Sequence, residues 1–194
     1  MSSYSHAPKL LPKRVLRRIK RLFIYNHKNG DVIWRIRPAP HSKKRAGDLV
    51  GHINNNGYRI TSFTINNKQY TVLAHHIAWF LYYGEWPSKE VDHRNTIRSD
   101  NRIKNLRLAT RRQTNRNRSV QSNNTSGITG ISWRKNRNKY RAYITVKNGT
   151  INLGYFNTLK EAIKVRQRAE RKYFKRFRYK EFESIQKLEP QHVT

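Results

Sequence analysis

The stretch from residue 115 to residue 125 constrains the fold most, because it divides the chain into two parts that must each bury a core of their own. It is rich in Asn, Ser, Arg and Gln and holds almost no apolar side chain. This composition is typical of an extended linker. We therefore expect a first module at 9–114, a second module at 126–178, and a tail at 179–194 without apolar periodicity.

The charge of the chain indicates its class of partner. It carries 42 Lys and Arg residues against 11 Asp and Glu residues, a formal net charge of +31. Like charges at this density repel one another in a compact state, and a polyanion relieves that repulsion. We expect nucleic acid, whose phosphates supply affinity without sequence preference. Ribosomal proteins are equally basic, so an RNA-binding or ribosome-associated protein remains an alternative.

Two absences from the sequence narrow the chemistry. The chain has no cysteine, which excludes disulfides, thiolate zinc sites and cysteine nucleophiles and fits a reducing compartment. No run approaches the roughly 18 apolar residues of a membrane-spanning helix. We therefore expect no membrane partner.

The first module begins with helix and hairpin patterns. An amphipathic stripe near the N-terminus predicts one helix. Two strand-like runs separated by a polar turn predict a hairpin, which is followed by a second, apolar helix. Of the two histidines on that second helix, we expect one in the core and the other at the surface. In chain order the patterns are the stripe of Val15, Ile19 and Leu22, a strand at 32–34, the runs 58–65 and 69–73 around Asn66-Asn67-Lys68, and the helix 75–83 with His75 and His76.

A strand–loop–strand–helix motif follows. Val91-Asp92-His93 forms the first strand, and residues 105–110 form the second. Thr110-x-x-Gln113 is a capping box, in which each side chain can bond a backbone N–H at a helix start, so a helix should begin at Arg111. Neighbouring side chains on a strand point to opposite faces, so Asp92 and His93 can serve one site only where the strand ends.

The residue types of this motif suit phosphodiester cleavage. That reaction needs a base to deprotonate water and a cation to stabilise charge on the phosphate. Histidine suits the first task because its pKa lies near neutrality. A carboxylate with an amide oxygen suits the second, because Mg²⁺ prefers hard oxygen ligands and keeps several waters. Asp-His pairs also occur by chance, so the motif alone leaves the activity open.

The block 73–117, LAHHIAWFLYYGEWPSKEVDHRNTIRSDNRIKNLRLATRRQTNRN, resembles the HNH endonuclease family of phage and intron homing type. The resemblance implies a fold of the α+β class built on a ββα-metal (His-Me) finger. It implies that His93 is the general base, that Asp92 binds the metal, and that Asn105 orients the histidine and braces the finger. It also implies duplex DNA as substrate, Mg²⁺ or else Mn²⁺ as cofactor without a small-molecule cofactor, and action in the cytoplasm of a bacterial host, as for a phage-encoded protein.

One position departs from that family's pattern. The last metal ligand, Asn or His, stands four residues after the threonine that matches Thr110. Here Thr114 occupies that position and Asn115 follows. Adjacent helical residues diverge by about 100°, so only one of them can face a metal. We expect Asn115 as the ligand, with Thr114 or no third protein ligand as alternatives.

The sequence of the second module predicts a three-stranded antiparallel sheet that packs against one helix. Three strand patterns are followed by the capping box Thr158-x-x-Glu161 and a helix with small and apolar residues at helical spacing. Alternation places one set of side chains inward, against the helix, and the other outward. The strands are 128–133, 140–146 and 151–156; the inward set is Ile131, Trp133, Tyr140, Ala142, Ile144, Ile151 and Leu153, and the outward set is Ser132, Arg134, Arg141, Tyr143, Thr145, Thr150 and Asn152.

The outward set suits phosphates and base edges, and a sheet can enter the major groove. A merely soluble sheet surface is the alternative. The runs 124–133, 140–144 and 153–156 resemble the Apetala/ethylene-response-factor type of DNA-binding domain. This resemblance places contacts at strand positions whose residues differ from the arginines and tryptophans of plant members, so no target sequence carries over. The DNA-binding residues that we expect are Arg134, Arg141, Tyr143, Thr145 and Asn152.

Together the patterns predict a metal-dependent homing-type endonuclease that nicks or cleaves duplex DNA. A DNA-binding protein whose catalytic site is weak or inactive is the main alternative, because of the departure at Thr114.

Overall fold

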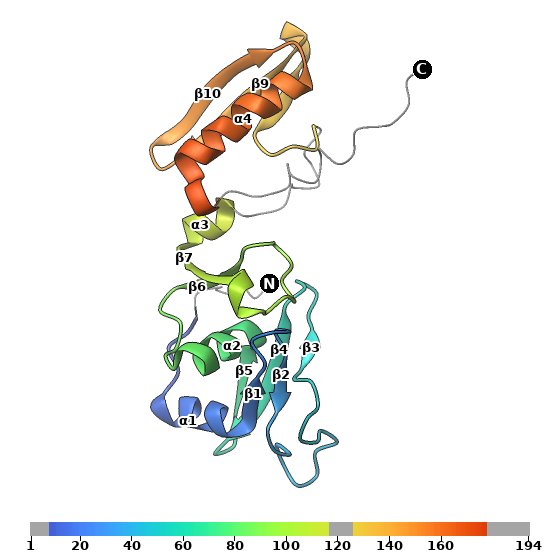
Figure 1. The fold of residues 1–194 in the computed structure, drawn as a ribbon, viewed down its shortest axis with the longest axis vertical. Helices are drawn as coiled ribbons and strands as arrows, with labels where there is room; N and C mark the ends of the chain where they lie inside the picture. Colours follow the sequence, from blue (N-terminus) through green and yellow to red (C-terminus); the bar gives the residue numbers. More distant parts are fainter. Residues whose placement is uncertain (1–7, 117–125, 178–194) are drawn as a thin grey trace, which may run out of the picture. The chain divides into compact units, whose positions relative to one another are not determined.

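The computed structural model describes residues 8–116 and 126–177. The chain forms two compact units, Met1–Thr114 and Asn115–Thr194 (Figure 1). Both units mix helices with strands, in agreement with the expected α+β class. None of the helices in the described ranges is both long enough and apolar enough to cross a membrane.

The first unit contains two small antiparallel sheets and a separate strand pair, packed with helices. Strands β1 and β2 form one sheet, β3, β4 and β5 the second, and β6 pairs with β7. The elements are α1 (Lys13–Leu22), β1 (Phe23–Tyr25), β2 (Val32–Trp34), β3 (His52–Ile53), β4 (Arg59–Ile65), β5 (Lys68–Leu73), α2 (Ala74–Tyr83), β6 (Glu90–His93), the short 3-10 helix η1 (Ile103–Asn105), β7 (Leu106–Ala109) and α3 (Arg111–Arg116).

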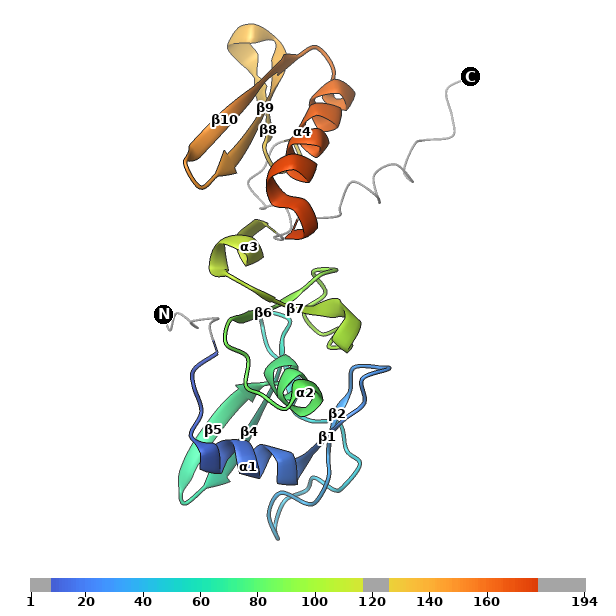
Figure 2. The same cartoon turned by 60° about the vertical axis from the view of Figure 1, so that its left-hand side comes forward.

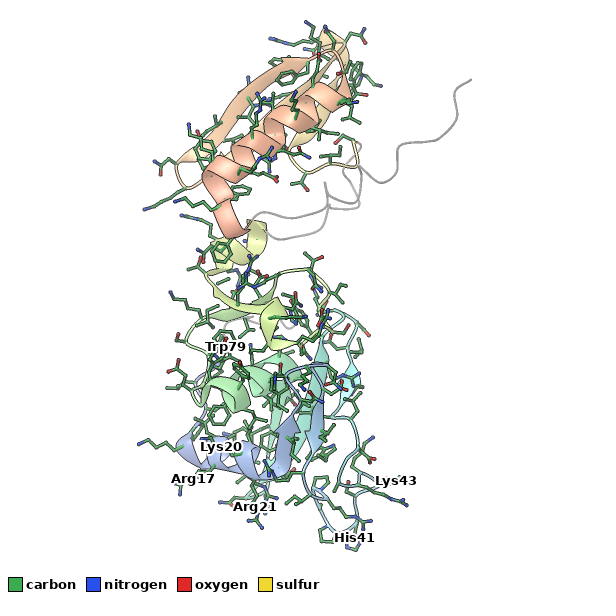
Figure 3. The ribbon with its side chains drawn as sticks, in the orientation of Figure 1. Arg17, Lys20, Arg21, His41, Lys43 and Trp79 are labelled. Carbon is green, nitrogen blue, oxygen red and sulfur yellow. The ribbon has the colours of Figure 1, made fainter. Side chains whose placement is uncertain are left out.

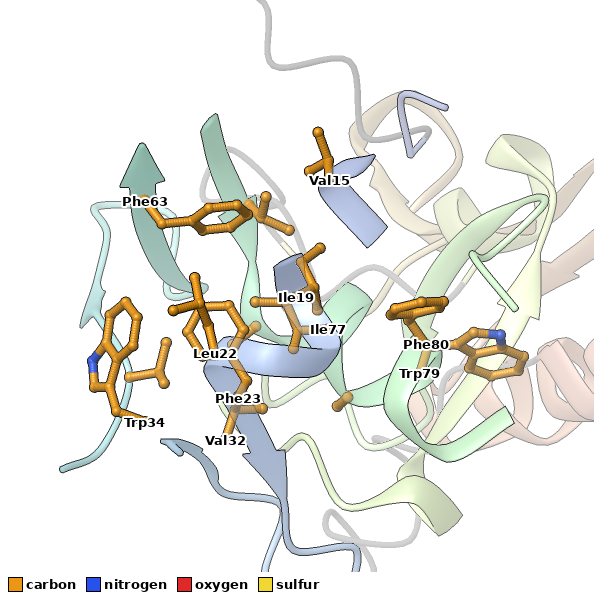
Figure 4. Packing of buried hydrophobic residues seen from close by; sticks show 14 of the residues in the cluster. Val15, Ile19, Leu22, Phe23, Val32, Trp34, Phe63, Ile77, Trp79 and Phe80 are labelled. Atoms are coloured by element: carbon orange, nitrogen blue, oxygen red, sulfur yellow. The ribbon is translucent and has the colours of Figure 1, made fainter. Parts of the chain in front are cut away.

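The core of the first unit lies between α1, α2 and the two sheets. The predicted stripe of α1 is fully buried, and Figure 4 shows Ile19 and Leu22 turned towards the aromatic side chains of the sheets and Ile77 of α2. Helix α2 contacts β1, β2, β4 and β5. The motif strands join the same core through Val91 and Leu106, so the position of the motif is tied to the body of the unit.

The predicted β4–β5 hairpin is present. Ile65 pairs with Lys68, which leaves Asn66 and Asn67 as a two-residue turn. Both asparagines have positive φ, 47° and 59°, the geometry of a type I′ turn, which asparagine tolerates better than most residues.

The second unit is a three-stranded antiparallel sheet in the order β10-β9-β8, covered on one face by α4. Figure 2 shows α4 lying along the sheet. Thr158 and Glu161 form the expected capping box at the start of α4. The elements are β8 (Ile131–Arg134), the short 3-10 helix η2 (Lys135–Arg137), β9 (Lys139–Val146), β10 (Gly149–Phe156), α4 (Leu159–Phe174) and the short 3-10 helix η3 (Lys175–Phe177).

The alternation predicted for this sheet holds with two modifications. A bulge between Asn152 and Gly154 shifts the register of β10, so that Phe156 rather than Tyr155 pairs opposite the inward Tyr140. Trp133 also pairs with Tyr140 on the inner face, but it remains 39% exposed. Its ring packs edge-on against Tyr140 rather than entering the core.

Candidate active site

Strands β6 and β7 bring the two halves of the motif together. They pair antiparallel, with Asp92 opposite Arg107 and His93 opposite Leu106. Strand β6 ends at His93, as a shared site for Asp92 and His93 requires. The chain then turns at Thr96, whose φ of 64° lies in the left-handed region.

The loop between the two strands, residues 94–102, is held by Asn105. The Asn105 side chain accepts a hydrogen bond from the backbone N–H of Asn95 at 3.0 Å and donates one to the carbonyl of Asp100 at 2.8 Å. Asp100 also binds Arg102 and Asn95, and the Arg102 guanidinium lowers the pKa of its carboxyl to about 2. These bonds brace the loop, which is one of the two roles that the resemblance implies for Asn105.

The ring of His93 is held by a different residue of that loop. Nε2 of His93 lies 3.1 Å from Oδ1 of Asn101, and both residues are buried. Because a carbonyl oxygen only accepts, Nε2 donates in this bond and the lone pair of the neutral ring lies on Nδ1. Asn101 therefore selects the tautomer in which Nδ1 is the basic nitrogen.

Asn101 is itself fixed by the N-terminal sheet. The hydroxyl of Tyr25 donates to the backbone carbonyl of Asn101 at 2.8 Å. The turn between β1 and β2 approaches the same place, because a Cβ added to Gly30 would lie 2.5 Å from the backbone nitrogen of Arg102. A contact 76 residues away in sequence thus sets the position of the residue that orients His93.

Aromatic rings enclose His93. The ring of His75 stands perpendicular to it at 5.0 Å between centroids, and Tyr58 contacts both rings. His93 is only 3% exposed, and burial lowers its pKa below the usual 6.5 because the charged form loses water. The hydrogen bond that the ring donates to Asn101 opposes this lowering in part. His75 and His76 are both buried, so the expectation that one would lie at the surface is wrong: every residue of α2 from Ala74 to Phe80 is covered.

The carboxylate of Asp92 is engaged by Arg107. Nε and Nη2 of Arg107 both lie 2.7 Å from Oδ2 of Asp92, and the two side chains are 7% and 6% exposed. A cation fixed beside a carboxylate in a buried site keeps that carboxylate ionised. Asp92 and His93 therefore differ in their surroundings, one facing an arginine and the other a set of rings.

The start of α3 carries the remaining predicted ligands. Thr110 and Gln113 bond reciprocally, which confirms the capping box. The hydroxyl of Thr114 donates back to the carbonyl of Thr110 at 3.3 Å, and Asn115 is exposed. In the described ranges no three His, Cys, Asp or Glu side chains gather as metal ligands. One carboxylate with neutral oxygens still fits a hydrated ion of the Mg²⁺ type, which binds few protein ligands and keeps its waters.

The outer face of the sheet in the second unit carries the predicted DNA-binding residues. Nε of Arg141 donates to Asn152 at 3.3 Å, and the guanidinium lies 5.4 Å from the Tyr143 ring centre. The hydroxyls of Thr145 and Thr150 lie 3.0 Å apart. Arg134, Thr145 and Asn152 are exposed, and Arg141 and Tyr143 are half-buried. The sheet thus presents a polar, cationic surface.

Three residues that the sequence patterns did not single out belong to this site: Asn101, Arg107 and Tyr25. Asn101 lies in a polar loop without periodicity, and Tyr25 lies in a separate sheet. Arg107 was within reach of sequence reasoning, because pairing the strands in the register that buries Val91 places it opposite Asp92.

Comparison with known proteins gives a match over the segment that contains β6, β7 and α3. No curated protein and no solved structure matches the chain. The model of one family matches residues 72–116, which run from the end of β5 to the end of α3. That family is the HNH endonucleases, so the segment that contains β6, the Asn105-braced loop, β7 and α3 is similar to an HNH endonuclease domain and supports a nuclease that acts on DNA.

Proposed function

We propose that this protein is a divalent-metal-dependent HNH endonuclease of homing type that hydrolyses duplex DNA in the cytoplasm of a bacterial host. The observation that carries the proposal is the hydrogen bond that Nε2 of His93 donates to Asn101, beside the buried carboxylate of Asp92, within the segment that matches the HNH endonucleases. The order of β6, loop, β7 and α3 is the order of a ββα-metal finger.

In this proposal His93 is the general base. Asn101 holds Nε2, and Nδ1 takes the proton from the attacking water. The lowered pKa of His93 keeps the ring neutral at physiological pH, which a base requires. Because the residue is 3% exposed, the neighbouring side chains must move apart when DNA binds.

Asp92 and Asn115 would hold the metal ion, and Asn105 would keep the loop in place. A bound Mg²⁺ or Mn²⁺ supplies positive charge to the phosphate and the leaving oxygen. Oδ2 of Asp92 contacts Arg107, so the carboxylate would share its negative charge between the arginine and the ion. The arginine keeps the carboxylate ionised and fixes its direction.

The outer face of the β8–β10 sheet would hold the DNA, in the manner of an Apetala/ethylene-response-factor domain. Arg134, Arg141, Tyr143, Thr145 and Asn152 are the residues that we assign to this contact. Replacing Arg141 by Gln should weaken duplex binding and lower its salt dependence by about one phosphate contact. Replacement of Lys164, which is exposed on α4 away from that sheet face, by Gln serves as the matched control.

Plasmid cleavage tests the enzymatic part. Supercoiled plasmid incubated with the full chain should be nicked or linearised in Mg²⁺ or Mn²⁺ and stay intact in a chelator. The ratio of nicked to linear product reports whether one strand or both are cut. Intact plasmid under every metal condition would contradict the proposal.

A second candidate, a DNA-binding protein without cleavage, is favoured by two observations. The carboxylate of Asp92 is engaged by Arg107, and His93 is enclosed by rings. In that case duplex DNA binds with equal affinity with and without divalent metal, and no product forms.

A further inference from the structure

One side of α1 carries five exposed cationic side chains and no acidic one. At about 100° per residue, the five span an arc of about 120° around the helix. The opposite side carries the buried Val15, Ile19 and Leu22. Figure 3 shows Arg17 and Arg21 projecting from the outer side of the helix. The basic face, as we call it, consists of Lys13, Arg14, Arg17, Lys20 and Arg21.

These charges are not balanced within the unit. In residues 8–116, the ion pairs join Arg102 to Asp100 and Arg107 to Asp92, and none involves the basic face. The basic surface continues beyond the helix, because the exposed Arg35 donates its backbone N–H to the carbonyl of Leu22 at 2.7 Å. The helix therefore presents its charge to solvent.

Part of this charge also opposes the stability of the helix, although Lys20 and Arg21 in the last turn suit the helix dipole. Lys13 and Arg14 occupy the first turn, which holds no acidic residue, although the helix dipole favours negative charge there. Lys13 and Arg17, like Arg17 and Arg21, stand four residues apart, where like charges repel. The repulsion between these like charges opposes folding of the free protein, which points to an anionic partner that relieves it.

The burial of the apolar side decides which anion fits. An amphipathic helix that binds a membrane surface inserts its apolar side between the lipids. In α1 that side belongs to the core, with Val15 and Ile19 0% exposed and Leu22 1% exposed. The most exposed side of the helix is the cationic one, and a row of charges without apolar contact suits a phosphate backbone.

We propose that the basic face of α1 binds the phosphate backbone of duplex DNA, away from the scissile phosphate. Both views place α1 across α2 from β6 and β7 (Figures 1 and 2), so this contact extends the footprint of the first unit beyond its cleavage motif. The choice of DNA over RNA rests on the proposed nuclease function. The existence of an electrostatic contact rests on the helix alone.

Salt dependence of DNA binding tests this proposal. The full chain is titrated with a duplex of about 30 base pairs in a chelator, which prevents cleavage, at several salt concentrations. The variant Arg14→Gln/Arg17→Gln/Arg21→Gln is compared with the control Lys28→Gln/Lys68→Gln/Lys89→Gln, whose three lysines are exposed elsewhere on the same unit. Each change removes three charges, and Gln and Arg have similar helix propensity.

We expect the α1 variant to lower the slope of log affinity against log salt by about 2.7, three contacts of about 0.9 each. The control should change it by less than one contact. Arg14→Lys/Arg17→Lys/Arg21→Lys should keep the slope of the wild type, because the contact needs positive charge and not the bidentate geometry of a guanidinium group. The thermal midpoint of the Gln variant should not fall below that of the wild type, since like-charge repulsion has been removed.

Equal slopes for the α1 variant and the control would overturn the proposal. The proposal would also be overturned if the α1 variant bound duplex DNA as the wild type does and lost affinity only for a structured RNA of the same length. The same holds if it lost affinity only for vesicles that contain an anionic lipid. Failure of the wild type to cleave plasmid, together with the expected change in slope, would remove the proposed nuclease and leave the basic face intact.

Discussion

Oδ1 of Asn101 lies 3.1 Å from Nε2 of His93, inside the first unit. This bond connects the loop after β6 to the residue that we assign as the base. The carbonyl of Asn101 in turn accepts from Tyr25 of β1, so the N-terminal sheet contributes to the position of the ring.

Replacing Asn101 by Ala should reduce kcat about 10- to 100-fold, the usual cost of losing a residue that orients a histidine. KM for DNA should change little, because Asn101 is buried. Asn101→Asp keeps an oxygen acceptor and adds negative charge, so it should raise the pKa of His93 and move the acidic limb of the pH profile upward. Steady-state cleavage from pH 5 to 8 measures both effects. An unchanged kcat for Asn101→Ala would contradict the role of this residue.

The lowered pKa of His93 predicts how activity and stability depend on pH. The His93 ring stays neutral at pH values somewhat below 6.5. Cleavage should therefore decline at a lower pH than it would with an exposed histidine as the base. Folding should weaken as pH falls below 6.5, because the unfolded chain binds a proton there that the folded chain does not. Urea unfolding from pH 4.5 to 7.5 measures this slope. In the variant His93→Gln the free energy of unfolding should depend less on pH. The same dependence in wild type and variant would mean that a group other than His93 causes it.

Replacing Arg107 by Met should lower the free energy of unfolding by about 3 kcal/mol, because it leaves the carboxylate of Asp92 buried without its cation. The double variant Asp92→Asn/Arg107→Met should recover part of this loss. If Asp92 binds metal, Mg²⁺ should raise the thermal midpoint of Arg107→Met and leave that of the double variant unchanged. Equal responses of the two variants to Mg²⁺ would remove Asp92 from the metal site.

Thr96 should be a strained position, because a β-branched residue rarely adopts a φ of 64°. Thr96→Gly should raise the free energy of unfolding by about 1 kcal/mol, the relief of strain less the entropy cost of glycine. Thr96→Val keeps the strain and loses the hydroxyl, which donates to the carbonyl of Asn95, so it should be less stable than the wild type. Urea unfolding of the three proteins gives the order; a destabilised glycine variant would contradict the argument.

Local features of this fold follow from the sequence because they depend on neighbouring residues. The Asn66-Asn67 turn, the two capping boxes and the buried stripe of α1 are of this kind. The Asn101–His93 bond depends on a loop path fixed by Asn105 and Tyr25. No pattern within the loop encodes it. The bulge near Leu153 likewise escaped prediction, since one extra residue in a strand leaves the apolar pattern before it intact.

The hydrolytic role of His93 is the central claim, and cleavage by His93→Ala at matched DNA binding tests it most directly. Wild type and variant are first shown to bind the same duplex with equal affinity in a chelator and are then given Mg²⁺ with supercoiled plasmid. The account predicts product from the wild type and a loss of at least 100-fold in rate for the variant, the lower range for removing a general base. Equal rates, or no product from either protein with binding intact, would contradict it.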